Sequence, residues 1–220
     1  MGVRFTEEEI LELENQLSCP SGLNGIEIGT RMNTSNFEMT KESIDALDLV
    51  DRNSVLELGH GNCGHLELIT GAADGIKYYG LEVSETMWQE AQKIATNGQA
   101  EFRLYDGRKI PYPDNCFNRI FTVNTIYFWS DVGFLIKEIV RTLKNEGILI
   151  LTFADKSFMK KLPFVGQKFK LFDTDDIYKL AEESGLEVLE IMHKSDEVKS
   201  KMGELVNRKF TVVKLIKNKT

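Results

Sequence analysis

The chain has 220 residues, of which 42% are hydrophobic and 28% are charged, and its formal net charge is −7. This length suits a single domain, residues 1–220, and the composition is that of a globular protein rather than a disordered or fibrous one. A negative charge without a lysine or arginine stripe argues against nucleic acid as the main partner and favours a small molecule.

Residues 1–50 are expected to form a helical preface, or lid, to the core. Apolar residues recur at helical spacing in two places: Ile10, Leu13 and Leu17, and then Ile44 and Leu47 after Thr40. Between these two helices, residues 32–39 are expected to form a polar break. The N-terminus fits a loose myristoylation pattern at Gly2, but Thr6 and Glu9 also form a capping box that opens a helix, and we favour the capping box.

After Ser54 the chain alternates strand-like and helical patterns, which predicts a doubly wound α/β sheet of parallel strands over residues 51–220. The expected strands are 54–58, 78–83, 100–105, 119–124 and 147–153. Helical faces between them comprise Met87, Ala91 and Ile94, and Leu135, Ile139 and Leu143. A helix over 174–184 ends at Gly185. Two β-rich runs, 186–193 and 209–216, follow and are expected to be antiparallel to each other, with the charged segment 194–208 between them.

Three cysteines stand far apart in the sequence: Cys19, Cys63 and Cys116. They form no C-x-x-C pair and have no histidine at a metal-ligand spacing, so we expect free thiols, a reducing compartment and no metal site. The sequence has no apolar signal core and no stretch long enough to span a bilayer. We therefore expect a cytoplasmic protein, monomeric or homodimeric, that does not bind membranes.

A nucleotide-binding loop is predicted directly after the first strand. The apolar run at 54–58 contains Glu57 and ends in three glycines, Gly59, Gly61 and Gly64. Glycine permits tight turns and close approach of the backbone to a ligand. Glu82 ends the next strand, 18 residues after Gly64. An acid at about that distance is typical of a ribose-binding carboxylate, so the pattern predicts a cofactor that contains adenosine.

These motifs resemble those of the class I S-adenosylmethionine-dependent methyltransferases, in the group that acts on small molecules. The resemblance covers residues 54–216. It rests on the glycine loop, on Glu82, on Asp106-Gly107 after the third strand, and on the segments 110–121 and 138–150. The family implies a Rossmann-like seven-stranded sheet whose last strand is antiparallel. One departure is Cys63, which stands where the family often has its third glycine.

The resemblance also implies the cofactor, S-adenosylmethionine, and its contacts. The backbone at Gly59 and Gly61 would pass under the methionine part, with Glu57 near the ammonium group. Glu82 would accept hydrogen bonds from the ribose hydroxyls, and Asp106 would meet the adenine amino group. The full set expected to bind the cofactor is Glu57, Gly59, His60, Gly61, Gly64, Glu82, Val83, Met87, Asp106, Gly107, Asn124 and Thr125.

The acceptor site is expected beside an aromatic cluster just past the fourth strand. Residues 33–40 and 155–172 are its expected walls, and the residues expected to contact the acceptor are Asn36, Tyr127, Phe128 and Trp129. Because 155–172 is rich in lysine and phenylalanine, an anionic acceptor is one hypothesis and a solvated lid is the other. Asn124-Thr-Ile-Tyr127 loosely resembles the Asn-Pro-Pro-Tyr motif of amino-group methyltransferases but lacks both prolines.

A sulfonium methyl is already activated, so alignment alone can drive its transfer and no catalytic triad is needed. Tyr127 and His60 are the candidates if a catalytic residue exists. Two alternatives remain open: an NAD-dependent oxidoreductase, because the three glycines also fit the dinucleotide pattern, and a non-catalytic module that binds S-adenosylmethionine. The sequence identifies neither the acceptor nor its accepting atom.

Overall fold

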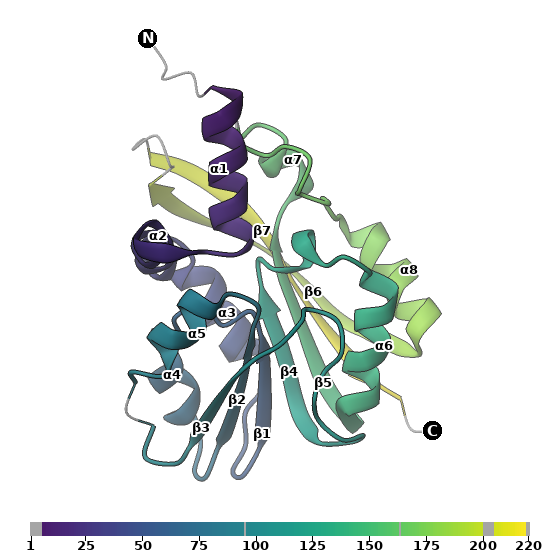
Figure 1. Ribbon diagram of the computed structural model, residues 1–220. Coiled ribbons are helices and arrows are strands. Elements are labelled where there is room, and N and C mark those ends of the chain that lie inside the picture. Colours follow the sequence, from purple (N-terminus) through teal and green to yellow (C-terminus); the bar gives the residue numbers. More distant parts are fainter. Residues whose placement is uncertain (1–5, 95, 163, 200–204, 219–220) are drawn as a thin grey trace.

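The computed structural model describes residues 6–94, 96–162, 164–199 and 205–218. Within these residues the chain forms a seven-stranded sheet in the order β3-β2-β1-β4-β5-β7-β6 (Figure 1). β7 is antiparallel to both of its neighbours, and every other pair is parallel. The strands are β1 (Ser54–Leu58), β2 (Lys77–Glu82), β3 (Ala100–Leu104), β4 (Phe117–Val123), β5 (Leu143–Ala154), β6 (Leu186–Lys199) and β7 (Leu205–Lys217).

Helices cover both faces of this sheet and one of its ends. The helical segments are α1 (Glu7–Ser18), α2 (Gly22–Ser35), α3 (Phe37–Ala46), α4 (Leu66–Thr70), α5 (Glu85–Ala91), η1 (Ile126–Phe128), α6 (Val132–Thr142), α7 (Lys156–Met159) and α8 (Thr174–Ser184). α3, α4 and α5 pack on one face, and α6 and α8 pack on the other (Figure 1). Each face has its own apolar core, with Phe121 on one side and Ile120 on the other, because successive strand residues alternate between faces.

The predicted fold class is confirmed: the sheet is doubly wound, with a helical preface and a reversed strand at its C-terminal end. The β1 bounds match the prediction, and α8 begins and ends where predicted. Its start is fixed by a capping box between Asp173 and Asp176, and its end by Gly185, whose φ is 76°. The capping box of Thr6 and Glu9 is also present, whereas Gly2 lies outside the described residues.

Two expectations about segment boundaries were wrong. The preface contains three helices, not two, and the expected polar break at 32–39 is helical except at Asn36. The two C-terminal strands extend well into the charged segment 194–208, because Asp196 pairs with Arg208 across the hairpin, with Nη2 to Oδ2 at 2.6 Å. Residues 200–204 of that segment lie outside the described residues.

The sheet directs its ligand site to the carboxyl ends of β1 and β4. These neighbouring strands are connected to opposite sides of the sheet, since β1 leads to β2 and β4 leads to β5. Loops that leave such a pair diverge and open a crevice between them. No helix among the described residues is long and apolar enough to cross a membrane.

Candidate functional site

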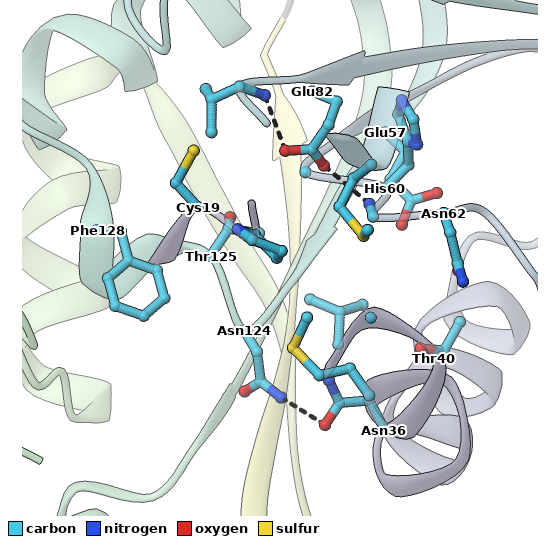
Figure 2. Close-up of a pocket in the computed structure, with 18 of the residues that line it drawn as sticks. Cys19, Asn36, Thr40, Glu57, His60, Asn62, Glu82, Asn124, Thr125 and Phe128 are labelled. Atoms are coloured by element: carbon cyan, nitrogen blue, oxygen red, sulfur yellow. Dashed lines mark hydrogen bonds between the residues drawn. The ribbon is translucent and has the colours of Figure 1, made fainter. Parts of the chain in front are cut away.

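A cavity of about 610 Å³ lies at the carboxyl ends of these strands (Figure 2). Its volume is typical of a cofactor or small-molecule site. All twelve residues that were predicted to bind the cofactor line this cavity: Glu57, Gly59, His60, Gly61, Gly64, Glu82, Val83, Met87, Asp106, Gly107, Asn124 and Thr125. Of the expected acceptor residues, Asn36, Phe128 and Trp129 line this cavity, while Tyr127 lines a smaller one beside it.

The glycine loop after β1 turns through three left-handed residues. Gly59 has φ 74° and Gly61 has φ 58°, and Cys63 adopts φ 56° although it carries a side chain. A Cβ on Gly59 would lie 2.5 Å from Thr125 Cγ2, so this position needs glycine for space as well as for conformation. Nothing lies within 4 Å of a Cβ on Gly61, which leaves room for a ligand beside the loop. Cys63 adopts the left-handed conformation that a glycine would take at this position, so the cysteine preserves the shape of the loop.

Glu82, at the end of β2, presents a buried carboxylate to the cavity and is 4% exposed. One oxygen accepts hydrogen bonds from the backbone N–H groups of Val83 (2.8 Å) and Ser84 (2.9 Å). The other accepts one from the N–H of Gly61 at 2.8 Å, which ties the acid to the loop (Figure 2). Burial raises the pKa of Glu82 to about 7, although these three bonds favour its charged form.

Asp106 and Gly107 form a tight turn at the end of β3. Asp106 Oδ1 accepts hydrogen bonds from the N–H groups of Arg108 (2.8 Å) and Lys109 (3.0 Å), and these bonds hold the pKa of its carboxyl below the usual value. Gly107 has φ 73°, and a Cβ there would lie 3.2 Å from Val83 Cγ1. The turn places an exposed carboxylate at the rim of the cavity.

Glu57, at the end of β1, is the centre of a buried polar cluster and is 2% exposed. Its Oε2 accepts a hydrogen bond from the Tyr78 hydroxyl at 2.6 Å and lies 2.7 Å from His65 Nε2. Burial disfavours the charged imidazole, but the Glu57 carboxylate outweighs this and raises the pKa of His65. The Cys63 thiol lies 3.4 Å from the Tyr78 hydroxyl.

The structure brings Cys63 close to His65, although the sequence showed no histidine at a metal-ligand spacing from a cysteine. Ligand atoms of Glu57, Cys63 and His65 lie within 4.8 Å of one another, close enough to meet at one metal ion. The two contacts to Glu57 Oε2 nevertheless account for the cluster as a hydrogen-bonded network. Within the described part of the chain all three cysteines are free thiols, as predicted.

Neither candidate catalytic residue has the environment of a general base. Tyr127 is 2% exposed; its hydroxyl accepts from the Ala154 N–H and donates to Asn124 Oδ1 at 2.9 Å, and burial raises its pKa. His60 packs against Phe102, with ring centroids 5.1 Å apart, and both of its ring nitrogens are buried without a hydrogen-bond partner. Burial lowers the pKa of His60 to about 4, so the imidazole is neutral at neutral pH.

Sequence reasoning expected residues 33–40 in the walls of the site but missed the contribution of α1 and of the segment that follows it. Leu17, Cys19 and Asn33 line the cavity, and Asn33 lies against the loop so closely that a Cβ on Gly64 would be 2.6 Å from its Nδ2. Ser84, which caps α5, donates a hydrogen bond to the carbonyl of Pro20 at 2.5 Å. The helical spacing of residues 10–17 was visible in the sequence, but no pattern indicated that this helix lies against the cavity.

A family model described as a methyltransferase domain matches residues 56–151, the stretch that holds the glycine loop, Glu82 and Asp106. This stretch, which is less than half of the chain, matches a methyltransferase domain, in agreement with the resemblance seen in the sequence motifs. The cofactor prediction is confirmed at the level of this methyltransferase family. The residues of this site fit S-adenosylmethionine, because the buried Glu82 carboxylate faces a loop with free space at Gly61.

Curated methyltransferases are similar to this chain over about half its length. It is 30% identical over 123 residues to phosphoethanolamine N-methyltransferase 3 of Arabidopsis thaliana, which covers 55% of the chain but 25% of that protein. It is 28% identical over 127 residues to the uncharacterized methyltransferase YdaC of Bacillus subtilis, which covers 56% of the chain and 68% of that protein.

Solved structures share this methyltransferase fold. The protein bound to the Trm112 methyltransferase activator of Haloferax volcanii superimposes with a TM-score of 0.73 at 14% identity, over 88% of this chain and 95% of that one. At this level of identity the likeness concerns the fold alone.

Proposed function

We propose that this chain transfers the methyl group of S-adenosylmethionine to a small-molecule acceptor. The observation that carries the proposal is the buried Glu82 carboxylate, fixed against the left-handed loop at the wall of the 610 Å³ cavity. A carboxylate is an acceptor-only group, so it suits two ribose hydroxyls. The family match favours this function over nicotinamide chemistry, which the glycine pattern alone left open.

The other cofactor contacts follow from the positions of the side chains. Asp106 uses one oxygen within its own turn, and we assign the other to the adenine amino group. The backbone at Gly59 and Gly61 would lie under the methionine part, where positive φ keeps side chains away. When bound, S-adenosylmethionine supplies a methyl group already activated as a sulfonium.

In this proposal the chain contributes alignment and exclusion of water rather than a base. Glu82, Asp106 and the glycine loop would hold the cofactor, which would supply the methyl group and keep the electron pair of its carbon–sulfur bond, while the acceptor would lose its proton to solvent. Tyr127 stays protonated and holds Asn124, and His60 stays neutral under the loop. Alignment of this kind can contribute about 7 to 11 kcal/mol at best.

Titration calorimetry with S-adenosylhomocysteine tests the cofactor part of the proposal. Wild-type protein should bind it, and Glu82→Gln should weaken binding by about tenfold or more, because hydrogen bonds to a charged group are worth about 1.5 to 3 kcal/mol. Glu85→Gln is the matched control, since Glu85 is an exposed acid three residues further on that does not line the cavity. Binding of NAD with no response to S-adenosylhomocysteine would overturn the proposal.

A radiomethyl transfer assay against small-molecule cell extract tests the activity. Labelled product that disappears with Glu82→Gln supports the enzyme. Cofactor binding without labelled product favours a non-catalytic binding module instead.

A further inference from the structure

A second cavity of about 140 Å³ adjoins the cofactor cavity and has a different chemical character. The two cavities share five lining residues: Leu17, Met32, Asn36, Asn124 and Phe128. At their boundary Asn124 Nδ2 donates to Asn36 Oδ1 at 3.2 Å (Figure 2). We refer to this second cavity, behind the Asn36–Asn124 pair, as the side chamber.

The walls of the side chamber are mostly aromatic and aliphatic. Phe169 lies over both Phe128 (ring centroids 4.8 Å apart) and Tyr127 (5.8 Å), and Phe158 and Met159 come from α7. The polar atom of Tyr127 is already engaged by Ala154 and Asn124. Because the exposed wall is apolar, the chamber favours an apolar group over water.

The cations beside the chamber are already neutralised or exposed. Arg208 is 7% exposed and directs Nε and Nη2 to the two carboxylate oxygens of Asp196, at 3.0 and 2.6 Å. Its Nη2 also donates to the carbonyl of Ser35, and its Nη1 donates to Asn36 Oδ1. Lys199, the other cation in the wall, is exposed to solvent. An anion in the chamber would therefore have to displace Asp196 from a buried pair, which is costly.

The lysines of segment 155–172 do not line either cavity, so the sequence-based hypothesis of an anionic acceptor finds no support in them. Lys156 pairs with Asp173 at 3.0 Å, and Lys170 Nζ donates to the carbonyls of Trp129 and Ser130, both at 2.9 Å. Neither cavity is lined by a lysine of this segment, whereas four of its phenylalanines and leucines line the side chamber: Phe158, Leu162, Phe164 and Phe169.

We propose that the side chamber binds the acceptor, and that this acceptor is a neutral small molecule with an apolar group the size of one aromatic ring. The size follows from the volume, because an apolar cavity of about 150 Å³ holds one benzene molecule. The Asn36 amide nitrogen would give the acceptor its polar contact on the side that faces the cofactor, since the two oxygens of the pair already accept from Asn124, Arg208 and Tyr127. This inference rests on the proposed methyl transfer and specifies its substrate class.

The first test uses the wild-type protein saturated with S-adenosylhomocysteine. Titration calorimetry compares 4-methylphenol with 4-hydroxybenzoate, two probes of similar shape of which only the second is charged at neutral pH. We expect 4-methylphenol to bind at least about tenfold more tightly, because burying an unpaired carboxylate is costly. Equal or tighter binding of 4-hydroxybenzoate, or of phosphoethanolamine, would overturn the inference. Failure to bind S-adenosylhomocysteine would instead refute the proposed function itself.

The second test enlarges the chamber. Phe169→Ala should weaken 4-methylphenol by about tenfold, since a ring's apolar contact is lost, and should strengthen binding of the larger 2-naphthol. Phe172→Ala is the matched control: Phe172 is a partly buried phenylalanine of the same segment that does not line the chamber, so both probes should keep their wild-type affinities. Affinity for S-adenosylhomocysteine, measured in the same samples, reports that each variant is folded. Identical effects of the two variants, or no gain for 2-naphthol, would overturn the inference.

Discussion

Affinity for S-adenosylhomocysteine should depend on pH through Glu82. This carboxyl has a pKa of about 7 in the free protein because it is buried. Two ribose hydroxyls that donate to it would favour the charged form, so ligand binding should release the proton. The perturbation that isolates the effect is Glu82→Gln, which keeps the size of the side chain but removes its titration.

The magnitude follows from the pKa. About a tenth of the Glu82 carboxyls are ionised at pH 6 and about nine-tenths at pH 8. Affinity should therefore fall by about tenfold, or about 1.4 kcal/mol, between pH 8 and pH 6. Glu82→Gln should bind weakly at both pH values and show no such slope.

Calorimetry in buffers with different ionisation enthalpies measures both the affinity and the number of protons released. Close to one proton per site should be released at pH 6 and close to none at pH 8. His65 also lines the cavity and its pKa is raised by Glu57, so His65→Gln serves as the control and should keep the slope. A flat affinity between pH 6 and pH 8, or a slope that is lost with His65→Gln instead, would refute the assignment.

Three further outcomes are expected. Between pH 5 and pH 8 the free energy of unfolding should fall by about 2 to 3 kcal/mol more in wild-type protein than in Glu82→Gln. The native carboxyl holds its proton up to about pH 7 while the unfolded one does not, so stability is lost as pH rises. Equal dependence on pH in the two proteins, measured by urea denaturation, would contradict this. Gly59→Ala should unfold at lower temperature than Gly61→Ala, because its Cβ would lie 2.5 Å from a threonine methyl; equal melting temperatures would argue against the close approach. Glu14→Ala removes the acceptor of two backbone N–H groups of the 164–169 segment and should cost about 1 to 3 kcal/mol by chemical denaturation. The matched change Glu8→Ala, at an exposed acid of α1, should cost much less.

The strands and the glycine loop were predictable because their signals are local. β1 is a short apolar run stopped by glycine, and α8 carries its own start and stop signals in Asp173 and Gly185. The polar residues near Met32 read as a break because such residues favour loops. They are helical because α2 packs closely against α5. A Cβ on Gly29 of α2 would lie only 2.5 Å from Sδ of Met87 in α5.

The acceptor side of the site was less accessible to sequence reasoning. Asn36 and Asn124 meet although 88 residues separate them, and Arg208 joins Asn36 from the C-terminal hairpin. Nothing local indicates such contacts. Segment 155–172 was expected near the acceptor, but its composition could not show that its phenylalanines line the side chamber and that Lys156 and Lys170 bond to other parts of the chain.

The two buried acids of the site, Glu57 and Glu82, have different hydrogen-bond partners and therefore different expected roles. Glu57 and Glu82 end adjacent strands, and both are less than 5% exposed. Glu57 directs one oxygen to both Tyr78 and His65, and this carboxylate raises the pKa of the imidazole beside it. Glu82 has only backbone N–H groups as partners, which hold its position without supplying a full charge. A carboxylate that is fixed but not neutralised is the one that gains most from hydroxyl donors, so the ligand should bind to Glu82 while Glu57 braces the loop.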